Sequence, residues 1–492
     1  MNLRIRSLCR FASRLLISLP NETHPKFKGV DEPDVEHEIL AEFFASLRAR
    51  AIKCIVLDEA QRDLRLVEFL IKSNHQTTCQ IVISGTPPCG FNMVDYGGSI
   101  SARVVSVPFG TLRGYEVRCL LQALFDEKDL SSGCWLDFWT VFNGEPGMYQ
   151  ELAQILGECG SELKSKIADE GISSIFESAR ALHQKYRDVR FGMSEALMTT
   201  IGVQRSRRDI GKKDVSTQKH IEDLLYKKIL ISMPSLTQFK SRHQNRAKMA
   251  NNWKSQQGSI VAWKDPYVKA RMRNSDQIEL HSFPLLRSFG LEDLIADLFE
   301  WHFTVGTDLE QELGIPCVGS DILFLDYEGG TDADLLLVQE NASIDRVFMF
   351  NIKTHPNLLL DDSGNRSKLK FETLCDDFKD FEVILILLVE DFKGVDPNLI
   401  YETWKDVKHC TLHKRVYSLS DFAQIAPKIP ITRRDAKLFV NRPLEENAIK
   451  EGLELGVHDV AIQGRYRVGK SHLLSEMARQ NDGWVYRELD AS

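Results

Sequence analysis

An eight-residue stretch near the end of the chain has the residue types and the spacing of a phosphate-binding loop. It follows the apolar run 460–463, precedes a predicted helix at 472–477, and fits the pattern G-x-x-x-x-G-K-[ST]. The glycines permit a tight loop whose backbone N–H groups surround phosphates, the lysine reaches the outer phosphates, and the serine hydroxyl binds Mg²⁺. The residues are Gly464, Arg465, Tyr466, Arg467, Val468, Gly469, Lys470 and Ser471.

Two adjacent acids near the start of the chain would supply the remaining chemistry of such a site. The sequence AIKCIVLDE at 51–59 is an apolar run of strand length that ends in Asp58 and Glu59. A buried parallel strand that ends in this way delivers the aspartate to the Mg²⁺ shell and the glutamate to the attacking water. A helix-like stretch at 64–72 and a second strand at 80–84 follow, which is the doubly wound pattern. Apolar strands that end in Asp-Glu also arise by chance.

These two halves of one site occur in swapped order. An entry helix, the first strand, the phosphate loop and the second strand are predicted within 436–492, whereas the acids and the next strands are predicted within 1–120. One end of the chain resumes where the other leaves off. The order predicts a circular permutation or a slice through tandem copies, and the site closes either within one chain or between chains.

Three N-terminal segments carry a resemblance to a known family. The sequences IVLDEAQR at 55–62, IVISGTPP at 81–88 and SARVVSVPFGTLRGYE at 101–116 resemble the archaeal-type, STAND-like branch of P-loop ATPases, which is related to AAA+ proteins. The sequence FNGEPGMYQEL at 142–152 is similar to the turn and helix that open the lid of these proteins. The resemblance implies an ATP hydrolase that uses ATP and Mg²⁺. The residues it implies are Asp58 and Ser471 for the metal, Glu59 and Lys470 for catalysis, and Ser84 or Thr86 as phosphate sensor. The sequence does not identify an arginine finger, for which Arg103 and Arg113 are candidates.

The middle of the chain is strongly basic. Residues 185–273 contain 20 Lys and Arg against 7 Asp and Glu, although the whole chain has a net charge of -8. Residues 194–233 are predicted to form a helix, a turn and a second helix that runs into a strand, with Ser216 as the N-cap of the second helix. The second helix is predicted to have one apolar face and a basic face opposite to it. The apolar residues are Ile221, Leu224, Leu225 and Ile229, and the basic ones are Lys219, Lys227 and Lys228. The resemblance implies a winged helix here, and its charge is suited to the phosphates of nucleic acid. The alternative is that this element only packs against its neighbours.

A third domain is predicted at 280–435. Its predicted elements are a helix at 285–303, strands at 321–326, 334–339, 346–353 and 382–389, and a helix at 368–381. This succession resembles restriction-endonuclease-like nucleases. The resemblance implies Glu292, Asp334 and Lys353 as the residues that hold a divalent metal and activate water. Asn351 stands where a further acid is expected, so the domain is either an active nuclease or a degenerate one that binds nucleic acid or protein.

Composition limits the class of protein. With 492 residues, 43% of them hydrophobic and 27% charged, the chain is expected to fold into several globular domains and not to enter a membrane. Ten cysteines without a CxxC pair argue against zinc and favour reduced thiols in an intracellular, cytoplasmic or nuclear, protein. The first twenty residues contain Arg4, Arg6, Arg10 and Arg14 and no acid, a composition shared by mitochondrial presequences and by ordinary amphipathic helices.

The expected architecture is therefore an α/β multidomain protein. Its parts are a P-loop NTPase sheet split between 436–492 and 1–120, a helical lid with a basic winged helix at 121–273, and a restriction-endonuclease-like domain at 280–435. The first functional hypothesis is an ATP-dependent switch coupled to nucleic acid or to a partner, with self-association as a further expectation. The alternatives are a metal-dependent endonuclease with a regulatory ATPase portion and an inactive fragment of a tandem-repeat ATPase.

Overall fold

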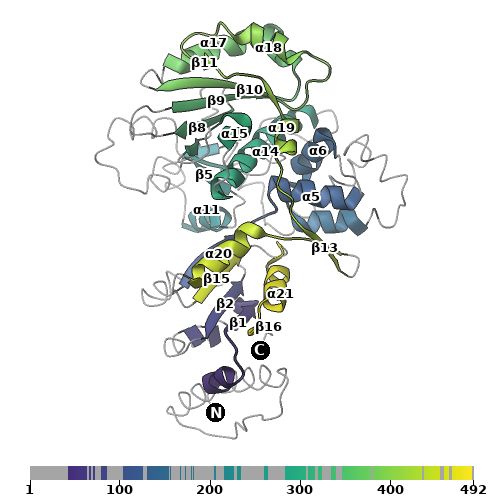
Figure 1. The fold of residues 1–492 in the computed structure, drawn as a ribbon. Helices are drawn as coiled ribbons and strands as arrows, with labels where there is room; N and C mark the ends of the chain where they lie inside the picture. Colours follow the sequence, from purple (N-terminus) through teal and green to yellow (C-terminus); the bar gives the residue numbers. More distant parts are fainter. Residues whose placement is uncertain are drawn as a thin grey trace. The chain divides into compact units, whose positions relative to one another are not determined.

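The computed structural model is an α/β protein that divides into two compact units (Figure 1). The first unit comprises residues 1–110 and 441–492, and the second comprises residues 111–440. The chain thus leaves the first unit before the predicted boundary at 120 and returns to it after the predicted boundary at 435. The structure describes residues 43–63, 66–67, 70–71, 79–85, 104–125, 130–154, 156, 167, 172, 179, 181, 204–206, 215–226, 230–233, 260–263, 283–305, 309–315, 320–323, 334–339, 346–376, 378, 381–434, 437–454, 459–464 and 468–489.

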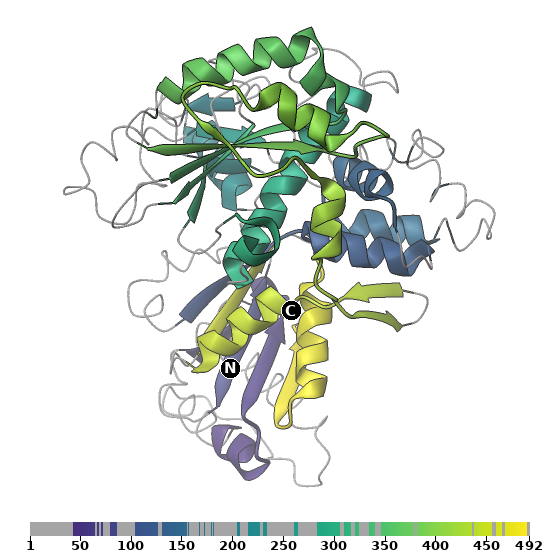
Figure 2. The same ribbon diagram turned by 45° about the horizontal axis from the view of Figure 1, so that its top comes forward.

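Both ends of the chain contribute strands to one parallel sheet in the first unit. The order is β16-β1-β2-β15-β3, and every neighbouring pair is parallel. Figure 2 shows the purple strands from the start of the chain beside yellow strands from its end. The strands β1 and β15 are buried along their whole length, which is why both read as continuous apolar runs. The strands are β1 (Cys54–Asp58), β2 (Gln80–Gly85), β3 (Val104–Phe109), β15 (Asp459–Gly464) and β16 (Trp484–Glu488).

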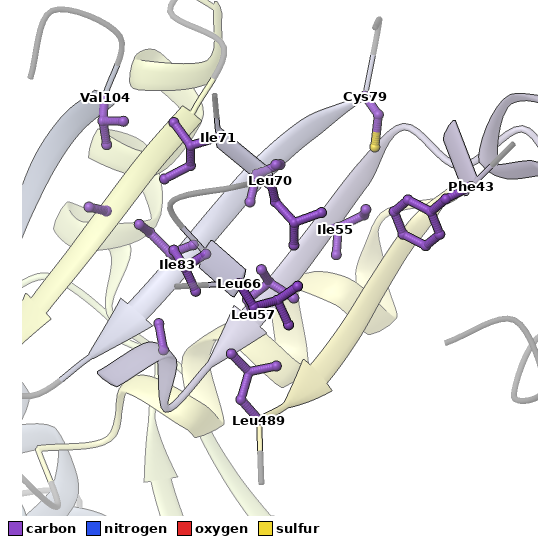
Figure 3. Close-up of a cluster of buried hydrophobic side chains, with 14 of the residues drawn as sticks. Phe43, Ile55, Leu57, Leu66, Leu70, Ile71, Cys79, Ile83, Val104 and Leu489 are labelled. Carbon is purple, nitrogen blue, oxygen red and sulfur yellow. The ribbon is translucent and has the colours of Figure 1, made fainter. Parts of the chain in front are cut away.

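Hydrophobic cores cover this sheet on both faces. Helices α20 (Pro443–Glu454) and α21 (Lys470–Gln480) cover one face, where Ile449, Leu474 and Met477 pack against strand residues. The other face packs against Phe43 and Leu47 and against apolar residues between 66 and 71. Figure 3 shows this second cluster, including Ile55, Leu57 and Ile83 from the strands. The 3₁₀ turn η1 (Ala60–Asp63) directly follows β1. The first unit is therefore doubly wound, as the alternation of strands and helices predicts.

The second unit is built on a mixed sheet of order β11-β10-β9-β8-β7, with β12 also paired to β10. Pairs β7-β8 and β8-β9 are antiparallel, whereas β10 is parallel to its neighbours. One face packs on α16, α17 and α18, and the other contacts α14 through Phe299 and Phe350. The bounds are β7 (Ser320–Leu323), β8 (Leu335–Gln339), β9 (Arg346–Lys353), β10 (Glu382–Val389), β11 (Thr411–Leu412), β12 (Tyr417–Ser418), α14 (Phe283–Val305), α15 (Leu309–Leu313), α16 (Asn357–Leu360), α17 (Asp362–Asp376), α18 (Pro397–Trp404) and α19 (Leu419–Gln424).

A helical layer of the second unit packs against α14. The side chains that join them are polar as well as apolar: Trp139 donates to Asp293, the backbone N–H of Gly114 donates to Asp297, and Tyr115 is hydrogen-bonded to His302. The helix that carries the predicted nuclease acid is thus mainly a core helix of this unit. The other elements here are α5 (Gly114–Phe125), α6 (Ser132–Phe142) and the antiparallel pair β13 (Ile431–Arg434) and β14 (Lys437–Val440).

A small antiparallel sheet of order β4-β6-β5 lies in the basic middle of the chain. Helix α11 (Val215–Tyr226) precedes β5 and buries Ile221 and Leu224, two of the residues predicted for its apolar face. The prediction of Ser216 as N-cap was wrong, because the helix already begins at Val215. The stretch predicted as a turn also contains a strand, β4. The strands are β4 (Gln204–Ser206), β5 (Leu230–Met233) and β6 (Ile260–Trp263).

Replacing Gly290 with alanine is expected to destabilise the protein by about 1–3 kcal/mol, because α14 and α6 touch at this residue. A Cβ atom at Gly290 would lie 2.0 Å from Thr140 Oγ1 and 2.8 Å from Thr140 Cβ. Urea denaturation followed by circular dichroism measures the loss. The matched control is Gly133→Ala on α6, where the nearest atoms would lie at 3.4 and 3.5 Å, so no loss is expected. Equal stability of the two variants would contradict close packing at Gly290.

Across the described ranges, no helix combines the length and apolar character needed to cross a bilayer. The longest of those helices, α14, has 23 residues and carries Arg287, Asp293 and Asp297. Its length reflects burial between the sheet and the helices α5 and α6.

Candidate functional site

The loop after β15 has the two glycines where its backbone requires them. Gly464 ends β15, and a Cβ atom there would lie 2.3 Å from the carbonyl oxygen of Phe109 on β3. Gly469 has φ of +102°, in the left-handed region that favours glycine, and directly precedes α21. Val468 between them is buried against the sheet. The predicted loop residues Arg465, Tyr466 and Arg467 lie outside the described residues.

Lys470 is the first residue of α21, and its ammonium group is buried. Its Nζ donates to the carbonyl oxygen of Gly464 at 2.9 Å. Burial lowers the pKa of Lys470 to about 8, and the negative charges of Asp58 and Glu59 act in the opposite direction. The acids from the start of the chain therefore lie close enough to the lysine from its end to influence its protonation.

Asp58 ends β1, and its fully buried carboxylate accepts three hydrogen bonds. Ser84 Oγ donates to Oδ1 at 2.6 Å, and the backbone N–H of Glu59 donates to the same oxygen at 2.9 Å. Tyr486 Oη donates to Oδ2 at 2.7 Å. Of the two predicted sensor residues, Ser84 thus contacts Asp58 directly from the neighbouring strand. Thr86 lies outside the described residues.

Glu59 follows in a backbone conformation that is rare for its residue type. Its φ is +53°, in the left-handed region, so the chain turns sharply out of β1 into η1. The carboxylate accepts a hydrogen bond from Gln61 Nε2 at 2.6 Å and forms an ion pair with Arg62 Nε at 3.5 Å. Arg62 also pairs with Glu488 at the end of β16. In this structure, Glu59 is therefore held by the turn that follows it.

Tyr486 on β16 is a residue of this site that the sequence analysis missed. It pairs in register with Val56 of β1, and its hydroxyl donates a hydrogen bond to Asp58. Burial, the hydrogen bond to Asp58 and the charge of Asp58 raise the pKa of Tyr486 well above its ordinary value. A tyrosine in an amphipathic strand is usually a core residue. The sequence alone therefore gives little indication that Tyr486 belongs to the site.

The oxygen groups at this edge fit Mg²⁺ held together with a phosphate ligand. Asp58 offers a carboxylate and Ser471 a hydroxyl, and both are hard oxygen donors. Within the described part of the chain, no group of three or more His, Cys, Asp and Glu side chains forms a metal cluster.

A second polar cluster lies in the sheet of the other unit. Asp334, just before β8, accepts hydrogen bonds through Oδ2 from the backbone N–H of Ile352 at 2.7 Å and from Lys353 Nζ at 3.2 Å. Two predicted nuclease residues, Asp334 and Lys353, are thus brought together. Asn351 on β9 is fully buried, and both polar atoms of its amide lack a hydrogen-bond partner in the described structure. Glu292 lies half-buried on α14.

The two arginine-finger candidates have different outcomes. Arg113 forms an ion pair with Glu300 of α14 at 3.3 Å, within the second unit. Arg103 lies outside the described residues. The side chains of Lys219, Lys227 and Lys228, which are predicted on the polar face of the helix in the basic middle, also lie outside the described residues.

Nucleotide affinity is expected to fall about tenfold per pH unit above pH 8, because a bound phosphate favours the ammonium form of Lys470. Below pH 8 the lysine is already protonated, and affinity should be flat with respect to this group. Titration of a fluorescent ATP analogue between pH 7 and 9.5 measures the effect. Lys470→Arg is the control, since its guanidinium stays charged and its weaker binding should not vary over this range. A flat profile for the wild type would contradict the prediction.

In comparisons with protein-family models, with curated proteins and with solved structures, no match to this chain was found.

Proposed function

We propose that this protein is a P-loop ATPase of the STAND-like, AAA+-related type that binds ATP with Mg²⁺ and uses hydrolysis as a switch. The observation that carries the proposal is the buried Lys470 after β15, whose pKa responds to Asp58 and Glu59 after β1. A lysine behind a glycine loop and an aspartate at the end of a buried strand of the same sheet are the two halves of a Mg²⁺-nucleotide site.

The sheet order supports closure of this site within one chain and a circularly permuted order of motifs. After β15 the chain crosses β2 and β1 to reach β16, which forms one edge of the sheet. The strand β3 forms the opposite edge and pairs with β15 on its other side. The strand β15 is therefore the point where the winding changes direction. Ligands of open α/β sheets bind at the carboxyl ends of strands at such a switch point. Gly464, Asp58 and Ser84 lie at or near the carboxyl ends of their strands.

Each residue of the site has a role in the proposed mechanism. The loop 464–471 and Lys470 hold the phosphates, and Asp58 and Ser471 are the groups that would hold Mg²⁺. When bound, Mg²⁺ supplies neutralisation of charge on the phosphate oxygens. Glu59 leaves its contacts with Gln61 and Arg62, orients the attacking water and accepts its proton.

The proposed output of the switch is contact with nucleic acid or with a protein partner inside the cell, in the cytoplasm, nucleus or mitochondrion. Helix α11, followed by the antiparallel strands β5 and β6 with β4 alongside, supports a winged helix. The excess of 13 positive charges across 185–273 favours phosphate contacts. The proposal also includes self-association of the protein as part of its response to the nucleotide.

Lys470→Ala tests the proposed function directly. Wild-type protein is expected to bind a fluorescent ATP analogue in the presence of Mg²⁺, and the variant is expected to lose at least about tenfold in affinity, since one charge-assisted contact contributes about 1.5–3 kcal/mol. The matched control is Lys450→Ala on α20, an exposed lysine paired with Glu446, which should bind as the wild type does. Equal binding, or equal absence of binding, by wild type and Lys470→Ala would overturn the proposal.

A metal-dependent endonuclease is the second candidate, and the Asp334–Lys353 pair favours it. The amide of Asn351 in place of an acid argues for a weaker metal site and for a degenerate nuclease domain. Manganese-dependent cleavage of nucleic acid that disappears in Asp334→Ala would support the candidate. Absence of cleavage by the wild type would leave this domain as a binding module.

A further inference from the structure

Tyr486 contacts one of the two groups that are proposed to hold Mg²⁺. Its strand, β16, runs parallel to β1, and the pairing continues from Val56 and Tyr486 to Asp58 and Glu488. From this position the hydroxyl donates to Asp58 Oδ2 at 2.7 Å. A residue outside both sequence motifs therefore contacts a proposed metal ligand.

The hydrogen bonds of Asp58 explain why this connection matters. The carboxylate is fully buried and accepts bonds from Ser84 Oγ, from the backbone N–H of Glu59 and from Tyr486 Oη. These donors stabilise its negative charge without a cation. A phenol carries its proton at neutral pH, so the Tyr486 hydroxyl is a donor there. A donor directed at Asp58 competes with a cation for the same oxygen.

We propose that the Tyr486 hydroxyl is a latch that occupies Asp58 Oδ2 and must be displaced when a divalent cation enters with the nucleotide. The inference rests on the proposed function and adds a positioning residue to it. The latch makes occupation of the site depend on the cation as well as on the nucleotide. The alternative is that Asp58 only satisfies a partly buried hydroxyl, in which case removal of the hydroxyl leaves the affinity for the cation unchanged.

Tyr486→Phe separates them, because it removes the hydroxyl and keeps the ring. Mg²⁺ is titrated against protein with a fluorescent ADP analogue, and ADP binding is measured separately in EDTA. The variant is expected to need about three- to tenfold less Mg²⁺ for half-saturation, which corresponds to loss of one competing hydrogen bond of roughly 0.5–1.5 kcal/mol. Its affinity for ADP in EDTA should equal that of the wild type.

Trp484→Phe is the matched control, an aromatic change two residues earlier on β16, on the same hydrophobic face, and it should leave the Mg²⁺ curve unchanged. Circular dichroism of all variants confirms that they fold. An unchanged or increased Mg²⁺ requirement in Tyr486→Phe would overturn the latch while leaving the proposed function standing. Absence of nucleotide binding by both the wild type and Lys470→Ala would overturn the proposed function and the latch with it.

Discussion

Replacing Glu59 with glutamine is expected to lower ATP turnover by about 10²- to 10⁴-fold, the usual contribution of a general base, and to leave ATP affinity nearly unchanged. Glutamine keeps the shape of the side chain and its contact with Gln61, but it cannot accept the proton of the attacking water. The left-handed backbone at Glu59 is compatible with either residue, so the fold should be preserved. Phosphate release gives the turnover, and titration with a fluorescent ATP analogue gives the affinity.

Glu488→Gln is the matched control for this variant. Glu488 is exposed and pairs with the same arginine, Arg62, but it lies at the end of β16, two residues beyond Tyr486. Its turnover should stay within about threefold of the wild type, because exposed ion pairs contribute little. Turnover by Glu59→Gln at the wild-type rate would exclude this residue as the base. Loss of binding in Glu59→Gln would instead indicate a structural role.

Replacing Arg287 with methionine is expected to destabilise the protein by about 3–5 kcal/mol, because it leaves two buried carboxylates without their cation. Arg287 on α14 donates from Nε to Asp137 Oδ1 at 2.6 Å and from Nη2 to Glu390 Oε1 at 2.7 Å. These contacts join α6, α14 and the end of β10 within the second unit. Urea denaturation of wild type and variant measures the difference in the free energy of unfolding.

The loss in the free energy of unfolding caused by Arg287→Met should also depend on pH and be larger at high pH. Burial raises the pKa of Asp137 to about 6, even beside Arg287, whereas an unfolded aspartate has a pKa of about 3.9. The cost of burying this carboxylate is therefore fully present above pH 6 and is relieved as pH falls from 6 towards 4. Arg287→Met should lose more stability at pH 7.5 than at pH 5.

Arg346→Met is the control for the ion-pair interpretation. Arg346 pairs with Glu382 across the exposed ends of β9 and β10, where both side chains are about two-fifths exposed, at 41% and 42%. Solvent screening reduces such a pair to roughly 1 kcal/mol or less, and no marked pH dependence between 5 and 7.5 is expected. Equal losses for the two arginine variants would show that burial does not distinguish them.

Local patterns were sufficient for many elements of the fold. The apolar runs at 346–353 and 382–389 correspond to β9 and β10 with the same bounds, and the long helix at 285–303 lies inside α14. These predictions succeeded because hydrophobic periodicity and strand length are properties of neighbouring residues. The bounds of α17, predicted at 368–381 and found at Asp362–Asp376, were less accurate, since helix ends depend on capping and tertiary contacts.

For the site, the sequence by itself determined the residues whose chemistry depends on adjacency. Gly464, Gly469 and Lys470 follow from one short pattern, and Asp58 with Glu59 follow from an apolar run that ends in two acids. Only the tertiary structure decided that β15 lies beside β2 and β3, that Lys470 is influenced by Asp58, and that Tyr486 donates a hydrogen bond to Asp58. The physical reason is that parallel strands pair without regard to their distance along the chain. Which side chains meet at the carboxyl edge is therefore set by the order of strands in the sheet, and residues that are not neighbours in sequence carry no local sign of it.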